Sequence, residues 1–265
     1  MGRSMQPPRS VSKLDRNRLP DFESFTGEVP YLTTAQMREV DRAMVDDFKI
    51  GLVQMMENAG RNLADLARRR FLDGDPTGKR IVVLAGTGGN GGGAMVCARW
   101  LHNHGAEVSV FTTRPDDEFT PAPARQLEIL RRMQAPVSPA GLLDTAGQPG
   151  LIIDGVIGYS LNGAPRGTAA DMILWANAQD APVLALDAPS GVDTTTGTVF
   201  DPAIKATATM TLALPKEGLR APGVAAHVGE LYLADIGVPP SLYAGAGLGL
   251  TVGNLFARSE IIRLS

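Results

Sequence analysis

The stretch VLAGTGGNGGGAMVCARWL, Val83 to Leu101, decides the fold of this chain. It begins at the end of an apolar run, continues through positions 86–93, which are glycine except for Thr87 and Asn90, and ends in a helical pattern. Glycine this dense costs conformational entropy on folding, so we expect that the structure requires a backbone without side chains at these positions. A loop between a strand and a helix can bind a phosphate with its N–H groups. We therefore expect a phosphate- or nucleotide-binding loop followed by a helix from Ala94; a tight packing turn is the alternative.

Beyond this stretch, short apolar runs alternate with helical stretches. Runs of Val, Ile and Leu without alternation are typical of strands that are covered on both faces, as in a parallel sheet wrapped by helices. The sequence therefore predicts an α/β domain. The expected strands span residues 81–86, 107–113, 151–158, 182–188, 206–214 and 230–235, and the expected helices span 33–48, 51–71, 94–105, 123–134 and 169–179.

The first two expected helices carry apolar stripes at helical spacing, and threonines at the start of the first one can cap it. The methionines in these stripes are interpreted as core residues rather than as a binding surface. The stripes consist of Met37, Val40, Met44, Val45 and Phe48 in the first helix, and of Leu52, Met55, Met56, Ala59, Leu63 and Leu66 in the second.

Composition excludes several classes of function. A net charge of −3 and an aromatic share of 5% argue against a nucleic-acid partner. Apolar runs stay short of the roughly 18 residues that a membrane helix needs, so no membrane partner is expected. The single cysteine, Cys97, can form no internal disulfide, which fits a reducing, cytoplasmic location. Residues 1–30 are polar and are expected to be a flexible tail, with one domain over residues 31–265.

Charged side chains follow the apolar residues of three of the expected strands. In a parallel sheet, ligands bind beyond the carboxyl ends of the strands, where Asp154, Asp187 and Lys216 would lie. A carboxylate there can act as an acid or a base; capping a helix or holding a turn is the alternative role. Lys216 could neutralise a phosphate or assist proton transfer, and a solvated surface charge is its alternative.

A dehydrogenase is disfavoured. The dinucleotide fingerprint has an acid about 20 residues beyond the glycines, to hold a ribose. Here that region reads FTTRP, with Arg114 and no carboxylate. The histidines show no spacing typical of a transition-metal site.

Four ordered motifs resemble those of the NAD(P)HX epimerase family, the YjeF N-terminal domain. The run Gly86–Ala94 is similar to the family's G-P-G-N-N-G-G-D-G. Asp154–Gly163 matches D-x-x-F/I-G-x-x-x-x-G, Asp187–Asp193 matches D-I-P-S-G-x-D, and Thr211–Lys216 matches T-L-x-x-P-K. The segments MREVDRAM and MMENAG are close to the family's opening pattern. The likeness extends over most of the chain, from Tyr31 to Pro240.

The resemblance implies a Rossmann-like three-layer sandwich, with a mostly parallel central sheet flanked by helices, in a homodimer. It implies the interconversion of the R and S forms of NADHX and NADPHX, hydrated at C6 of the nicotinamide ring, and a separate NAD(P)HX dehydratase as pathway partner. A potassium ion is the implied cofactor, held by Asn90, Asp154 and Ser190. The implied substrate-binding residues are Gly89, Asn90, Gly91, Gly92, Gly93, Gly158, Tyr159, Ser160, Leu161, Asn162, Gly163, Ala164 and Asp187.

One carboxyl group can serve the chemistry of such a hydrate. The C6 hydroxyl leaves once an acid protonates it and the ring nitrogen donates electrons, and water then returns to the other face and loses a proton to a base. A single carboxyl group can serve as both, and Asp187 is the candidate. Lys216 would tune Asp187 or hold the polar end of the substrate.

The glycine motif departs from the family pattern. Gly89 replaces an asparagine, Gly93 an aspartate and Ala94 a glycine, so two polar contacts are lost and the loop is expected to be more mobile. These changes favour a second hypothesis, a non-catalytic nucleotide-binding or scaffold module on the same fold, whereas the retained Asp187 and Lys216 oppose it. Arg114 is a candidate contact for a 2′-phosphate or a plain surface charge.

Overall fold

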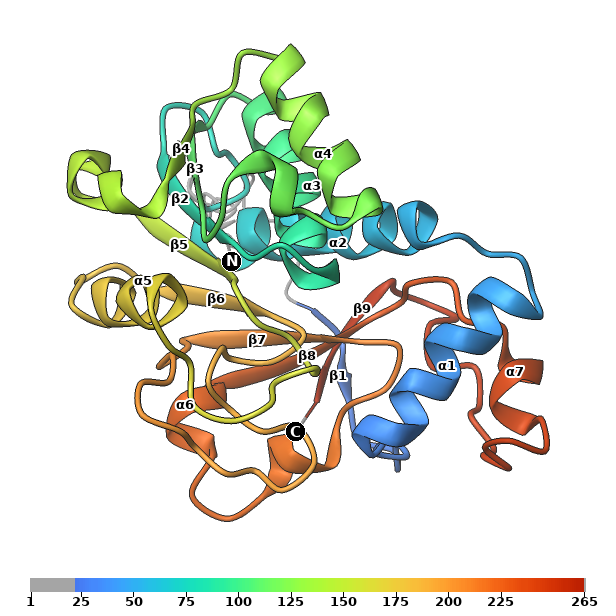
Figure 1. Ribbon diagram of the computed structural model, residues 1–265. Helices are drawn as coiled ribbons and strands as arrows, with labels where there is room; N and C mark the ends of the chain where they lie inside the picture. The colour runs from blue at the N-terminus through green and yellow to red at the C-terminus, as the bar shows by residue number, and fades with distance from the viewer. Residues whose placement is uncertain (1–21, 265) are drawn as a thin grey trace, which may run out of the picture.

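The computed structural model describes residues 22–264 (Figure 1). Its centre is a nine-stranded sheet in the order β1-β9-β8-β7-β6-β5-β2-β3-β4. Every neighbouring pair is parallel except β8 and β9. The strands are β1 (Ser24–Phe25), β2 (Arg80–Ala85), β3 (Glu107–Thr112), β4 (Val137–Pro139), β5 (Leu151–Gly155), β6 (Val183–Leu186), β7 (Ala208–Leu212), β8 (Glu230–Ala234) and β9 (Ile261–Leu264).

Helices cover both faces of this sheet, which confirms the predicted three layers (Figure 1). One apolar core joins the sheet to α2, α3 and α4, and a second core on the opposite face joins it to α5 and a 3₁₀ helix at 140–146. A third core lies beyond the end of β7, under α1 and α7. The helices are α1 (Thr34–Asp46), α2 (Leu52–Phe71), α3 (Gly89–Asn103), α4 (Pro121–Arg132), α5 (Thr168–Asn177), α6 (Ala225–Val228) and α7 (Pro240–Ala244), with 3₁₀ helices at Asp116–Glu118, Ala140–Ala146 and Glu217–Arg220.

The glycine run is mostly helix, which corrects the expected mobile loop. Helix α3 begins at Gly89, five residues before the expected start, so only residues 86–88 connect it to β2. The glycines are needed for close packing. A Cβ on Gly91 would lie 1.8 Å from the carbonyl oxygen of Gly86, and one on Gly93 would lie 2.8 Å from Leu186 Cδ2.

The two opening helices form as predicted, apart from the ends of their stripes. Thr33 caps α1 in a capping box with Gln36. The stripe residues inside both helices are buried or half-buried. Phe48, however, lies past the end of α1 and is 40% exposed, and Leu52, in the first turn of α2, is 47% exposed. The stripes therefore bury less surface than their spacing predicts.

Ordered structure in the sheet begins before Tyr31. Of the predicted tail 1–30, residues 1–21 lie outside the described residues, whereas Ser24 and Phe25 form β1 beside β9. Strands β1, β4 and β9 were not identified by sequence patterning, and β1 joins the sheet through β9. Strand β9 pairs with β8 in antiparallel fashion.

The buried cysteine and the lengths of the helices bear on what the composition predicted. Cys97 is fully buried in α3 as a free thiol, and burial raises the pKa of this thiol far above its ordinary value. Within residues 22–264, no helix combines the length and apolar character that crossing a lipid bilayer would require.

Candidate active site

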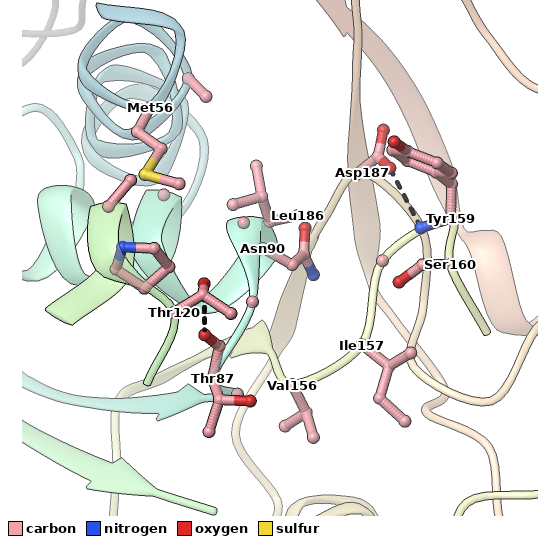
Figure 2. Close-up of a pocket in the computed structure, with 18 of the residues that line it drawn as sticks. Met56, Thr87, Asn90, Thr120, Val156, Ile157, Tyr159, Ser160, Leu186 and Asp187 are labelled. Atoms are coloured by element: carbon pink, nitrogen blue, oxygen red, sulfur yellow. Dashed lines mark hydrogen bonds between the residues drawn. The ribbon is translucent and has the colours of Figure 1, made fainter. Parts of the chain in front are cut away.

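A pocket of about 880 Å³ lies at the carboxyl ends of the central strands. Its lining comes from the turn after β2, the segment after β5 and Asp187 after β6, which are places where the sequence predicted ligand contacts. Helices α1 and α2 contribute Asp41, Met55 and Met56 to its wall. Figure 2 shows Asp187 and Tyr159 on one side of this pocket and Met56, Thr87 and Thr120 on the other.

Asp187 stands where β6 ends, with one carboxylate oxygen toward each of two neighbours. Its backbone N–H donates to the carbonyl of Met210 at 2.7 Å, and its φ of 65° turns the chain sharply. Oδ1 accepts from the ammonium of Lys216, and Oδ2 accepts from the backbone N–H of Tyr159 at 3.3 Å. The side chain is 4% exposed and lines the pocket. The carboxylate is therefore buried, oriented and reachable from the pocket.

Lys216 is not a surface charge but is fully buried. Besides Asp187, its Nζ donates to the carbonyl of Leu212 at 2.9 Å and to Thr211 Oγ1 at 3.3 Å, so all three ammonium protons have partners. A buried charge without a partner costs several kcal/mol, so each member of the Asp187–Lys216 pair requires the other. Lys216 does not line the pocket; it supports Asp187 from behind.

Asp154, near the end of β5, and Ser190, after β6, connect the ends of these two strands. The expectation that Asp154 lies beyond its strand in the ligand crevice is wrong, because it is part of β5 and neither it nor Ser190 lines the pocket. Asp154 is fully buried and accepts hydrogen bonds from the N–H and Oγ–H of Ser190 at 2.8 and 2.6 Å and from the N–H of Val156 at 3.2 Å. The N–H of Ile157 donates to Ser190 Oγ at 2.8 Å. Burial raises the pKa of Asp154 to about 6. This network fixes the pocket wall at residues 156–160 relative to Asp187.

Asn90 lies against the same wall. A Cβ on Gly158 would be 3.1 Å from Asn90 Oδ1 and Cγ, so the amide packs on the backbone there. Its Nδ2 is buried and has no hydrogen-bond partner within residues 22–264. Asn90 thus presents an unused polar atom beside Gly158, in the pocket wall that the Asp154–Ser190 network holds.

The other predicted binding residues separate into two groups. Gly89, Asn90, Gly93, Gly158, Tyr159, Ser160 and Asp187 line the pocket, as does Arg114. Gly91 and Gly92 are buried inside α3. The pocket lining does not include Gly91, Gly92, Leu161, Asn162, Gly163 or Ala164.

Sequence reasoning assigned no role to Asp41. Asp41 comes from the segment MREVDRAM in α1 and lines the pocket, and its Oδ2 accepts a hydrogen bond from the hydroxyl of Tyr159. Burial raises its pKa. A signal was available in the spacing, since Asp41 is four residues after Met37 and three before Met44 and so shares their buried face.

This chain is similar in sequence to a known protein family. A family model described as "YjeF-related protein N-terminus" matches residues 52–218. The chain belongs to the YjeF N-terminal family. This YjeF N-terminal chain is 43% identical over 221 residues to a protein of Dehalogenimonas lykanthroporepellens named NAD(P)H-hydrate epimerase. The aligned region covers 82% of this chain and 86% of the relative.

Other relatives are longer. A bifunctional NAD(P)H-hydrate repair enzyme Nnr of Moorella thermoacetica is 36% identical over 225 residues, which is 80% of this YjeF N-terminal chain but 41% of the relative. The fold is also that of the yeast protein YNL200c, whose crystal structure superposes with a TM-score of 0.73 at 23% identity, covering 89% of this chain and all of the yeast chain.

Proposed function

We propose that this YjeF N-terminal chain is an NAD(P)H-hydrate epimerase, which interconverts the R and S forms of hydrated NADH and NADPH. Several relatives carry this name, among them the one that is 43% identical. The observation that carries the proposal is Asp187, a single carboxylate that opens into a nucleotide-sized pocket and is held by Lys216 and the amide of Tyr159.

Asp187 acts as the acid and then as the base. Its carboxyl form gives a proton to the C6 hydroxyl, the C6–O bond breaks, and water leaves as the ring nitrogen donates its electron pair to C6. Water then adds to the other face of C6, and the Asp187 carboxylate takes the released proton. Atoms and charge balance over the cycle, so no redox step is needed. The Lys216 ammonium stabilises the carboxylate between the two proton transfers.

The pocket binds the rest of the coenzyme. The N–H groups at the start of α3 would bind a phosphate of the coenzyme, and Thr87 and Thr120 add hydroxyl groups to the same pocket. Apolar contacts come from Met55 and Met56 on α2. Arg114 also lines the pocket and remains the candidate contact for a 2′-phosphate.

A potassium ion fits the residues Asn90, Asp154 and Ser190. They offer amide, carboxylate and hydroxyl oxygens, which are the ligands that such a hard cation prefers. The buried amide of Asn90 has an unused polar atom, and half a turn of that amide would place its oxygen there. When bound, the ion would add positive charge beside the phosphates of the substrate. The protein residues would hold the pocket wall at 156–160 in place around it.

Two partners of this chain follow from the proposed function, a second copy of the chain and a dehydratase. We expect a homodimer and a separate NAD(P)HX dehydratase acting on the same hydrates. Relatives such as the Moorella protein are named bifunctional repair enzymes, and this chain aligns with 41% of that protein. A coupled repair assay with purified dehydratase would test the pathway, and sedimentation would test the dimer.

The decisive experiment measures exchange between R- and S-NADHX by chromatography. Purified protein is expected to accelerate the exchange, and Asp187→Ala is expected to lose about a hundredfold or more of that acceleration, because the acid–base group is gone. Asp144→Ala, which replaces an exposed aspartate outside the pocket, serves as the control and should keep full activity. Exchange at the spontaneous rate with wild-type protein, together with tight binding of NADH, would favour the non-catalytic module instead.

A further inference from the structure

Tyr159 is held by three segments that are distant in the sequence. Its backbone N–H donates to Asp187 Oδ2 at 3.3 Å, and its carbonyl accepts from Thr194 Oγ1 at 3.3 Å. Its hydroxyl donates to Asp41 Oδ2 in α1. Thr194 Oγ1 in turn lies 3.1 Å from the hydroxyl of Thr34, at the start of α1. One residue thus connects the candidate acid–base group to the first helix of the domain.

The burial of the Asp41 carboxylate costs free energy, which the hydrogen bond from Tyr159 offsets. Asp41 lies on the buried face of α1 between Met37 and Met44, where a carboxylate loses solvation. The hydroxyl of Tyr159 is the hydrogen-bond donor to its carboxylate. An apolar residue at this position would bury more surface and continue the stripe of α1. Packing alone therefore gives no reason for an aspartate here.

The two contacts of Asp187 determine where its carboxylate points. Lys216 holds Oδ1 from behind, and the Tyr159 amide holds Oδ2 from the pocket side. Figure 2 shows the Tyr159 ring beside Asp187, with its amide directed at the carboxylate. If residues 158–160 moved away, Oδ2 would lose this donor and the carboxylate could rotate. Acid–base catalysis depends on such positioning, and a small displacement lowers the rate strongly.

We propose that Asp41 is a positioning residue that, through the hydroxyl of Tyr159, keeps the Tyr159 amide on the carboxylate of Asp187. This inference rests on the proposed epimerase function. It assigns a role to the acidic residue of α1 and explains why this helix, far from Asp187 in the sequence, borders the site.

The test compares Asp41→Ala, Tyr159→Phe and the double variant in the R/S exchange assay. Each single change is expected to lower kcat at least about tenfold and to leave KM within about twofold, because alignment is lost rather than binding. The double variant should be no slower than the slower single variant, since both remove the same hydrogen bond. Asp41→Asn, whose amide oxygen still accepts from the hydroxyl, should retain more activity than Asp41→Ala.

Asp46→Ala is the matched control. Asp46 is on the same helix, its side chain is 61% exposed, and its ion pair with Arg42 spans 3.9 Å, so activity should not change. The inference would be overturned if the single variants had the wild-type kcat, or if the two reductions in kcat multiplied in the double variant. If Asp41→Ala does not fold, the kcat of Tyr159→Phe alone tests the positioning role, because this change removes only the hydroxyl group.

A readout without turnover separates this inference from the proposed function. A crystal structure of Asp41→Ala is expected to show the Tyr159 amide withdrawn from Asp187, whatever reaction the protein catalyses. An unchanged Tyr159–Asp187 contact in that structure would refute the positioning role. Failure of the epimerase proposal is recognised by a different result, namely wild-type protein that does not accelerate the exchange.

Discussion

The backbone of Asp187 occupies an uncommon conformation for a residue with a side chain. A positive φ such as its 65° is disfavoured outside glycine and costs about 1 to 3 kcal/mol. Three contacts stabilise this conformation: the hydrogen bond from the Asp187 N–H to the Met210 carbonyl, the ion pair with Lys216, and the hydrogen bond from the Tyr159 amide. Such conformations gather at functional sites because the surrounding structure must maintain them. Here the turn directs a carboxylate into the pocket immediately after a buried strand.

Gly91 shows that the glycine run serves packing. We expect Gly91→Ala to lower the free energy of unfolding by at least about 3 kcal/mol, because its Cβ would lie 1.8 Å from the Gly86 carbonyl oxygen. Chemical denaturation measures this loss. Gly88→Ala is the control, since no atom of residues 22–264 lies within 4 Å of a Cβ there and its φ of −96° suits alanine. Equal stability of the two variants would contradict the packing role.

At the scale of elements, α2 is joined to the sheet by an ion pair at β8. Arg70 of α2 donates two hydrogen bonds of 2.9 Å to Glu230, and Tyr232 adds a third of 2.7 Å. These contacts, the one with Arg70 above all, lower the pKa of Glu230 to about 2. Because the pKa is lower in the folded than in the unfolded chain, the pair stabilises the fold above about pH 4.5 and loses its effect as pH falls toward 2.

Glu230→Gln tests this pH dependence. It should cost about 1 kcal/mol of unfolding free energy at pH 7, allowing for partial exposure, and the difference from wild type should shrink at pH 3.5. Denaturant titrations at both pH values measure it. Glu260→Gln removes a more exposed partner of Arg61, also on α2, and should have a smaller effect. If Glu230→Gln lowered the unfolding free energy by the same amount at pH 3.5 as at pH 7, the proposed pH dependence would be refuted.

Some elements were predictable because their signals are local. The apolar runs of β2, β5 and β6 and the stripes of α1 and α2 depend on neighbouring residues alone, and the structure confirms them. The start of α3 was not predictable, because glycine is a poor helix former and the packing that compensates comes from Gly86 and Leu186. Strand β9 has four residues, and its antiparallel pairing with β8 depends on a partner far away in the sequence.

At the scale of the whole molecule, the site is assembled from segments that span most of the domain. Asp41, Asn90, Asp187 and Lys216 are separated by long stretches of sequence and meet where the parallel strands end. A ligand in the pocket would contact α1, α2, α3 and the turns after β5 and β6 at once. Binding should therefore stabilise the folded domain as a unit.

This coupling predicts a shift in thermal unfolding. A hydrated coenzyme at 100 times its Kd should add about 2.7 kcal/mol to the unfolding free energy, which corresponds to about 5 to 10 °C in Tm. Differential scanning fluorimetry measures the shift, and free nicotinamide at the same concentration is the control, since it lacks the phosphates. No shift at saturating concentration would argue against binding in this pocket.

What the sequence alone determined are the features that follow from local pattern and motif order: the parallel α/β sandwich, the junction of strand and helix at the glycines, and the places of Asp187 and Lys216 beyond the ends of two strands. Only the tertiary structure decided that Lys216 is buried against Asp187, that Gly91 packs in a helix, and that Asp41 reaches the pocket through Tyr159. The physical reason is that burial and side-chain pairing depend on segments brought together from across the chain, and one-dimensional spacing does not contain their distances.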